Sequence, residues 1–126
     1  MTAVDTAQPP RRRILVVEDE IELSGLLKAI LTDEAYAVEQ AYSVSDALHL
    51  LDEDTFDAAV LDVELRDGMV FAVADALKAR RIPYMFLSAV YKGVVPAVHG
   101  RVRFVSKPYQ LEELKHHVGQ MLDGRP

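Results

Sequence analysis

The chain has 126 residues, half of them hydrophobic, and its 14 basic against 20 acidic side chains give a net charge of −6. This length suits one domain with a single core. The acidic balance argues against nucleic acid or an anionic membrane surface as the main partner. The absence of cysteine excludes disulfides, thiolate catalysis and cysteine-based zinc sites. No apolar run has the length of a transmembrane helix or the pattern of a signal peptide, so we expect a cytoplasmic protein without membrane insertion.

The first residues of the chain differ in composition from the rest. Residues 1–11 include Pro9 and Pro10, which favour an extended and poorly ordered segment. We therefore expect a disordered tail over residues 1–11 and one folded domain over residues 12–123.

Short apolar runs then alternate with stretches of helical periodicity. Continuous apolar runs are typical of strands covered on both faces, whereas the mixed second run favours an edge strand. Apolar residues three and four positions apart predict the helices that connect them. In chain order the predicted elements are a strand at 14–17, a helix around 23–31, an edge strand at 36–41, a helix around 44–51, a strand at 58–61, a helix around 70–77, a strand at 84–87, a strand at 102–105 and a helix around 111–122.

The alternation predicts an α/β fold, with a doubly wound parallel sheet and right-handed crossovers. The fourth crossover differs from the others, because residues 89–100 contain Gly93, Pro96 and Gly100. Glycine and proline disfavour helix interiors, so we expect a short or irregular helix there.

Polar side chains follow the predicted strands at the points where binding sites form in open parallel sheets. Each of these residues taken alone is typical of a turn, a helix cap or a solvated side chain. Together they place carboxylates, hydroxyls and an amine at one edge of the sheet. The residues are Glu18, Asp19 and Glu20 after the first strand, Asp62 after the third, Ser88 at the end of the fourth, and Ser106, Lys107 and Pro108 after the fifth.

This grouping suits phosphoryl transfer. Magnesium binds one or two carboxylates together with waters and phosphate oxygens. A carboxylate beside the ion can attack a phosphorus atom and form an acyl phosphate. The ion and a lysine would then offset the charge on the transferred group.

The motifs ILVVEDE, AAVLDVEL, YMFLSA and RFVSKPY, with 43, 26 and 19 residues separating Asp19, Asp62, Ser88 and Lys107, resemble a response-regulator receiver domain of two-component signalling. The resemblance runs from about Arg12 to Leu122. It implies a flavodoxin-like five-stranded sheet of order 2-1-3-4-5.

The resemblance also implies a role for each site residue. Asp62 would be the phosphoacceptor, with Mg²⁺ held by Glu18, Asp19, Asp62 and the main-chain carbonyl of Glu64. Lys107 would contact the phosphoryl oxygens, and its peptide bond to Pro108 would be cis. Ser88 and Phe104 would form the switch pair.

The sequence departs from the family pattern near the site. The loop after Asp62, LRDG, is short and lacks a proline, and Phe104 stands where the family more often has tyrosine. Glu64 adds a carboxylate and Val90 an apolar side chain at positions where the family tunes dephosphorylation. The short segment before Lys107 puts the usual output surface in question.

The expected function is that of a single-domain response regulator that accepts a phosphoryl group on Asp62 from a phosphohistidine, with Mg²⁺ as cofactor. It would signal by a surface change coupled to Ser88 and Phe104 or by phosphorelay, and the sequence leaves open a third role as a phosphate sink for a shared kinase. It is not an enzyme in the usual sense, because it catalyses only its own phosphorylation and dephosphorylation. The expected partners are a sensor histidine kinase or histidine phosphotransfer protein and an unidentified downstream protein, with the chain a monomer or weak dimer.

Two other classes remain open from the sequence. One is a phosphate-independent interaction module on a receiver fold, against which the intact set of Asp62, Ser88 and Lys107 argues. The other is a flavodoxin-like cofactor carrier, which needs anion-receptive groups after the first strand. The acidic run Glu18, Asp19 and Glu20 would repel a phosphate there. The four histidines are interpreted as structural or surface residues.

Overall fold

The structure, a computed structural model, describes residues 11–90 and 92–124. Apart from the exposed Arg11, the predicted tail lies outside these residues. In chain order the elements are β1 (Arg13–Val17), α1 (Ile21–Asp33), β2 (Ala37–Ala41), α2 (Val44–Glu53), β3 (Ala58–Leu61), β4 (Glu64–Leu65), β5 (Gly68–Met69), α3 (Phe71–Ala79), β6 (Tyr84–Ser88), the 3-10 turns η2 (Lys92–Val94) and η3 (Ala97–His99), β7 (Phe104–Ser106) and α4 (Leu111–Leu122).

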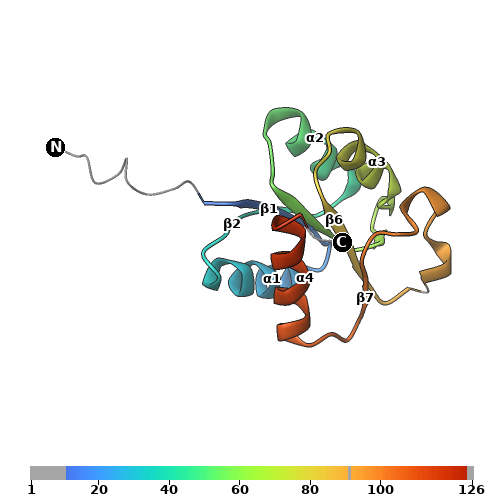
Figure 1. Cartoon of the computed structure of the whole chain (residues 1–126). Coiled ribbons are helices and arrows are strands. Elements are labelled where there is room, and N and C mark those ends of the chain that lie inside the picture. Colours follow the sequence, from blue (N-terminus) through green and yellow to red (C-terminus); the bar gives the residue numbers. More distant parts are fainter. Residues whose placement is uncertain (1–10, 91, 125–126) are drawn as a thin grey trace.

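Five strands form one parallel sheet in the order β2-β1-β3-β6-β7. Counted over the five predicted strands this is the order 2-1-3-4-5, so the predicted fold class is confirmed. Figure 1 shows α1 and α4 on one face of the sheet and α2 and α3 on the other. Because all five strands run in the same direction, their carboxyl ends meet at one edge of the sheet.

The apolar strands are buried because both faces of the sheet are covered. Side chains alternate along β1, so Ile14 and Val16 pack with α1 and α4, whereas Leu15 and Val17 pack with α2 and α3. All four are at most 1% exposed. Two cores, one on each face, therefore fix the sheet and with it the loops at its carboxyl edge.

Two strands begin later than predicted, because the chain is still turning where the apolar run starts. The amide of Tyr36 donates to the carbonyl of Leu31 and closes the end of α1, so β2 begins at Ala37. The amide of Val102 donates to the carbonyl of His99 in the same way, so β7 begins at Phe104. The hairpin of β4 and β5 was not predicted from the sequence.

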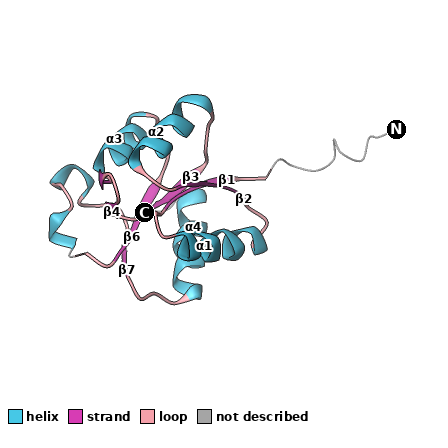
Figure 2. Ribbon diagram, turned by 180° about the vertical axis from the view of Figure 1, so that it is seen from behind, coloured by secondary structure: helices cyan, strands magenta, loops and turns pink. Residues whose placement is uncertain are grey.

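The fourth crossover contains two 3-10 turns in place of a regular helix, which agrees with the prediction for this segment. It lies beside α3 (Figure 2), where Lys78 Nζ donates to the carbonyl of Val98 at 3.2 Å. The buried ring of His99 anchors it, with Nδ1 2.5 Å from Tyr84 Oη and Nε2 2.7 Å from Asp75 Oδ1. His99 also packs against the ring of Phe86. Tertiary contacts therefore hold a segment that has little regular structure of its own.

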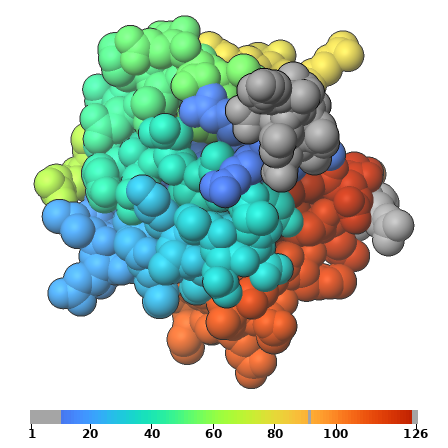
Figure 3. Space-filling view, turned by 90° about the vertical axis from the view of Figure 1, so that its left-hand side faces the viewer, coloured from blue at the N-terminus to red at the C-terminus, as the bar shows by residue number. Residues whose placement is uncertain are grey.

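The charged residues are unevenly distributed along this fold. Residues 76–111, which include β6, η2, η3 and β7, hold seven lysines and arginines and no aspartate or glutamate. All 20 acidic residues therefore lie outside that segment. Figure 3 shows the side of the molecule that faces away from most of this basic segment. The surface there is formed mainly by α1 (blue), by β2 and α2 (cyan to green) and by α4 (red).

A membrane-spanning helix would need to be long and apolar. Within the ranges 11–90 and 92–124, none of the helices meets both conditions.

Candidate functional site

The carboxyl ends of β1 and β3 place two acidic residues side by side. Glu18 directly follows β1, and its amide donates to the carbonyl of Ala41 at 3.0 Å. Asp62 directly follows β3, and its amide donates to the carbonyl of Val17 at 2.9 Å. Both residues thus continue the sheet's hydrogen bonding, which fixes their backbones at the edge predicted from the sequence.

An acidic cluster forms at this edge. Glu18, Asp19 and Asp62 each offer a carboxylate oxygen, and the three oxygens lie within 4.8 Å of one another. The side chain of Glu18 is 2% exposed and that of Asp62 is 11% exposed. Carboxylates held this close repel one another unless a cation or a proton intervenes. Oxygen ligands of this kind are the donor set that Mg²⁺ prefers.

Lys107 supplies a cation to the cluster. Its Nζ lies 2.8 Å from Glu18 Oε1 and 3.2 Å from Asp62 Oδ2. Burial raises the pKa of Glu18, although the hydrogen bond from Lys107 opposes that shift. Burial alone would lower the pKa of Lys107, but its contacts with Glu18 and Asp62 outweigh it and raise the pKa. Lys107 is therefore held as an ammonium group between two carboxylates.

The remaining predicted site residues lie on the neighbouring strands. Ser88 ends β6, is buried, and its Oγ accepts a hydrogen bond from the amide of Val90 at 3.3 Å. The amide of Lys107 donates to the carbonyl of Ser88, which joins the ends of β6 and β7. The peptide bond between Lys107 and Pro108 is cis. Ser88 therefore lies at the same edge as the acidic cluster.

Phe104 lies farther back on β7, opposite Phe86 of β6. The two ring centroids are 6.3 Å apart, and Phe104 is half-buried. Phe86 also contacts the ring of His99. Phe104 thus belongs to an aromatic cluster that extends from β7 to the fourth crossover.

The loop after Asp62 turns back toward the site. The amide of Glu64 donates to Asp62 Oδ1 at 3.4 Å, while the side chain of Glu64 is exposed. The extra carboxylate noted in the sequence therefore faces solvent. Asp67, in the same loop, accepts hydrogen bonds from the amides of Val44 and Ser45 at the start of α2. Sequence reasoning missed this role, because its only local signal is an aspartate in a turn before glycine.

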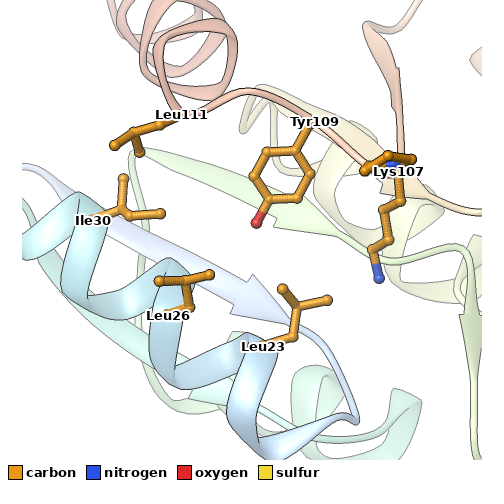
Figure 4. Close-up of a pocket in the computed structure, with 7 residues that line it drawn as sticks. Leu23, Leu26, Ile30, Lys107, Tyr109 and Leu111 are labelled. Atoms are coloured by element: carbon orange, nitrogen blue, oxygen red, sulfur yellow. The ribbon is translucent and has the colours of Figure 1, made fainter.

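An apolar groove with a volume of about 490 Å³ adjoins the acidic cluster. Figure 4 shows Leu23, Leu26 and Ile30 of α1 on one side and Leu111 of α4 on the other, with Lys107 at one end. The groove is lined by Leu23, Leu26, Ile30, Lys107, Pro108, Tyr109 and Leu111.

Tyr109, which the sequence analysis did not single out, lies between the two helices. Its hydroxyl points toward α1 (Figure 4), is buried, and has no hydrogen-bond partner among the described residues. Burial raises the pKa of Tyr109, so the hydroxyl stays protonated at neutral pH. Leu26 is 53% exposed and Leu111 is 43% exposed. The groove thus presents open apolar surface and an unused donor.

Comparison with known proteins identifies relatives of this chain. The family model described as "Response regulator receiver domain" matches residues 14–119. The transcriptional regulatory protein TcrA of Mycobacterium tuberculosis is 35% identical over 107 residues, covering 81% of this chain and 42% of TcrA. The chain therefore spans less than half the length of this relative.

Solved structures show the same similarity. The non-phosphorylated HemR receiver domain from Leptospira biflexa matches with 32% identity and a TM-score of 0.77, covering 89% of this chain and 94% of that one. The response regulator TrrA from Thermotoga maritima, solved in complex with Mg²⁺ and BeF, matches with 27% identity and a TM-score of 0.79, covering 88% and 99% of the two chains. This chain belongs to the response-regulator receiver domain family of two-component signalling.

Proposed function

We propose that Asp62 accepts a phosphoryl group from a phosphohistidine of a sensor kinase or a histidine phosphotransfer protein. The observation that carries the proposal is the contact of Lys107 Nζ with both Glu18 and Asp62 inside the acidic cluster. One phosphoryl group could then contact the nucleophilic carboxylate, the carboxylates that bind the cation and the ammonium group of Lys107.

The donor set fits magnesium. Carboxylate oxygens of Glu18, Asp19 and Asp62, completed by the main-chain carbonyl of Glu64, would hold the ion. Mg²⁺ supplies charge compensation for the phosphoryl oxygens when it is bound. TrrA, a similar protein of the same family, was solved with Mg²⁺ and BeF.

The reaction assigns each step to a residue of the chain. An oxygen of Asp62 attacks phosphorus while the bond from phosphorus to the histidine nitrogen breaks, and the imidazole leaves with that electron pair. Lys107 then exchanges its contact with Asp62 for one with a phosphoryl oxygen. The chain is consumed as a reactant, so it acts on itself and is not an enzyme with a separate substrate.

The new charge is expected to change the neighbouring surface. Ser88 lies at the same edge and would turn its hydroxyl from the amide of Val90 to a phosphoryl oxygen. Phe104 would follow, because its ring packs against Phe86, which lies two residues before Ser88 on β6. A local charge event of this kind biases the surface around residues 89–118, which a downstream partner would read.

We assign the groove between α1 and α4 to the phosphohistidine donor. Continuity with the site supports this, because Lys107 both lines the groove and contacts Asp62. A donor that inserts apolar side chains between Leu26 and Leu111 would bury their exposed surface and bring its phosphohistidine toward the acidic cluster. An acceptor on the donor could also take the hydrogen bond of Tyr109 Oη.

The test of the reaction is the intact mass of the protein after incubation with acetyl phosphate and Mg²⁺. We expect one phosphoryl adduct, about 80 Da, on the wild type, and none on Asp62→Asn or without the ion. If the phosphoryl adduct is hydrolysed too quickly for mass measurement, binding of beryllofluoride, which mimics the phosphoryl group, still detects the site. An adduct on Asp62→Asn at the wild-type rate contradicts the assignment, and failure of both reagents favours the phosphate-independent module.

The docking assignment is tested separately with two donors. Leu26→Asp should slow transfer from a histidine-phosphorylated kinase core and leave the reaction with acetyl phosphate unchanged. Val98→Asp is the matched control, because Val98 is similarly exposed, at 56%, but lies on the fourth crossover. Equal slowing by both variants would contradict docking in the groove.

A further inference from the structure

The loop that follows Asp62 is a short hairpin whose tip is tied to a distant helix. Strands β4 and β5 are two residues each and pair Glu64 with Met69 and Leu65 with Gly68, so Arg66 and Asp67 form the turn. From this turn, Asp67 Oδ1 accepts the amide of Val44 at 2.8 Å and Oδ2 accepts the amide of Ser45 at 3.1 Å. One carboxylate therefore joins the hairpin to the first turn of α2.

The first turn of α2 is well suited to hold this carboxylate. The amides at the start of a helix have no partner within the helix, and the helix dipole favours negative charge there. Ser43 already serves as the cap from within the chain, since its Oγ accepts the amide of Asp46 at 3.0 Å. Asp67 takes two further amides. These two hydrogen bonds hold the pKa of Asp67 below its usual value, so the carboxylate stays ionised.

The hairpin needs such an attachment because it is too short to be stable by itself. At its base, the amide of Asp62 bonds to the carbonyl of Val17 and the amide of Val70 to the carbonyl of Val63. Between base and tip, Leu65 packs into the core shared with α2 and α3. At the tip, Asp67 provides the polar attachment.

Glu64 lies between these attachment points. Its amide donates to Asp62 Oδ1 at 3.4 Å, and its carbonyl is the main-chain ligand expected for a bound cation. Both groups belong to the backbone of β4, whose position follows that of the hairpin. A shift of the tip away from α2 would thus move groups next to the phosphoacceptor.

We propose that Asp67 is a positioning residue for the cation site, acting by holding the hairpin against α2 so that the backbone of Glu64 faces Asp62. This inference rests on the proposed function of Asp62. Asp67 lies outside the cluster of Glu18, Asp19 and Asp62 that would hold the cation. Because coupling between two sites is reciprocal, a cation that orders Glu64 also protects the amides of Val44 and Ser45.

The experiment compares three variants by hydrogen exchange and by Mg²⁺ titration, both followed in NMR spectra. Asp67→Ala should weaken Mg²⁺ binding about tenfold, as removal of a supporting residue typically does. The amide of Glu64 should exchange faster in this variant even without the ion. Asp67→Asn keeps one oxygen acceptor, so its Mg²⁺ affinity should lie between that of the wild type and that of Asp67→Ala.

Ser43→Ala is the matched control. It removes a cap from the same helix without touching the hairpin, so the amide of Asp46 should exchange faster. Its Mg²⁺ affinity should stay within about twofold of the wild type, because the two bonds of Asp67 remain. Equal loss of Mg²⁺ affinity in Ser43→Ala and Asp67→Ala would show that α2 stability alone matters and would overturn the inference.

Wild-type affinity in Asp67→Ala would overturn it as well. Absence of Mg²⁺ binding in the wild type would instead count against the proposed function. In that case the exchange of the Glu64 amide still decides the role of Asp67, which requires faster exchange in Asp67→Ala than in Ser43→Ala. Should Asp67→Ala fail to fold, the same comparison is made with Asp67→Asn.

Discussion

Replacing His99 by alanine should destabilise the whole domain, although His99 lies in a segment of 3-10 turns. Its ring is 1% exposed and contacts Tyr84 and Asp75 through its two nitrogens. The ring also lies edge-on to Phe86, with centroids 6.2 Å apart. A side chain with this environment is part of the core, even though no helix carries it.

The loss in free energy of unfolding can be worked out from the groups that lose a contact when His99 is replaced by alanine. Tyr84 is 9% exposed, so its hydroxyl would lose its partner in a buried position, at a cost of about 1–3 kcal/mol. The emptied ring volume and the lost contact with Phe86 bring the total to about 3–4 kcal/mol, the range for truncating a buried ring. Asp75 is mostly exposed and can turn to water. For a domain of this size the unfolding midpoint should fall by roughly 15 °C.

The assay is urea and thermal unfolding followed by far-UV circular dichroism. His49→Ala is the matched control, because the side chain of His49 is 72% exposed and lies 3.3 Å from that of Glu53, one helical turn away, so the change should cost at most about 0.5 kcal/mol. A double-mutant cycle with Tyr84→Phe should give a coupling of about 1 kcal/mol or more. A cost below about 1 kcal/mol for His99→Ala would refute the view that this side chain anchors the fourth crossover.

Two further predictions concern pH and the cation. Burial, with the charges of Arg103 and His116, lowers the pKa of His117, so stability should be complete above about pH 6.5 and fall as the pH drops toward the lowered pKa. A plot of the unfolding free energy against pH between 7 and 5 should be clearly flatter for His117→Gln than for the wild type. His116→Gln should change that slope less, because burial is the largest cause of the lowered pKa and the charge of His116 a smaller one. Equal slopes in all three proteins would contradict the assignment. Mg²⁺ at ten times its dissociation constant should raise the free energy of unfolding by about 1.4 kcal/mol, reversibly with a chelator. The same rise in Asp19→Asn, measured at the same ion concentration, would show that the ion binds elsewhere.

The sequence predicted those features that depend on periodicity and on strand ends. Apolar runs such as residues 58–61 gave the buried strands, and the ends of the strands located Glu18, Asp62 and Lys107 at one edge. Both follow from rules that act over a few residues, since alternation and strand direction are local properties. The irregular fourth crossover was predictable for the same reason, from Gly93 and Pro96.

The features that escaped prediction depend on partners far along the chain. His99 has its partners 15 and 24 residues away, and Asp67 bonds to amides 22 and 23 residues away. No spacing in the sequence signals such contacts, because they depend on which helices flank which strands. Strands of two residues, as in β4 and β5, are too short to show a period.

The separation of charge along the chain has a consequence for how the molecule meets other molecules. Residues 76–111 carry only basic charges and include the strands β6 and β7 at one edge of the sheet. The acidic remainder gives the domain an electric dipole, although its net charge is negative. A charged partner is therefore oriented before contact, by a field that reaches about 10 Å at 0.1 M salt. For a partner of a given charge, added salt should thus slow its encounter with one of the two sides, β7 or α1, and speed its encounter with the other.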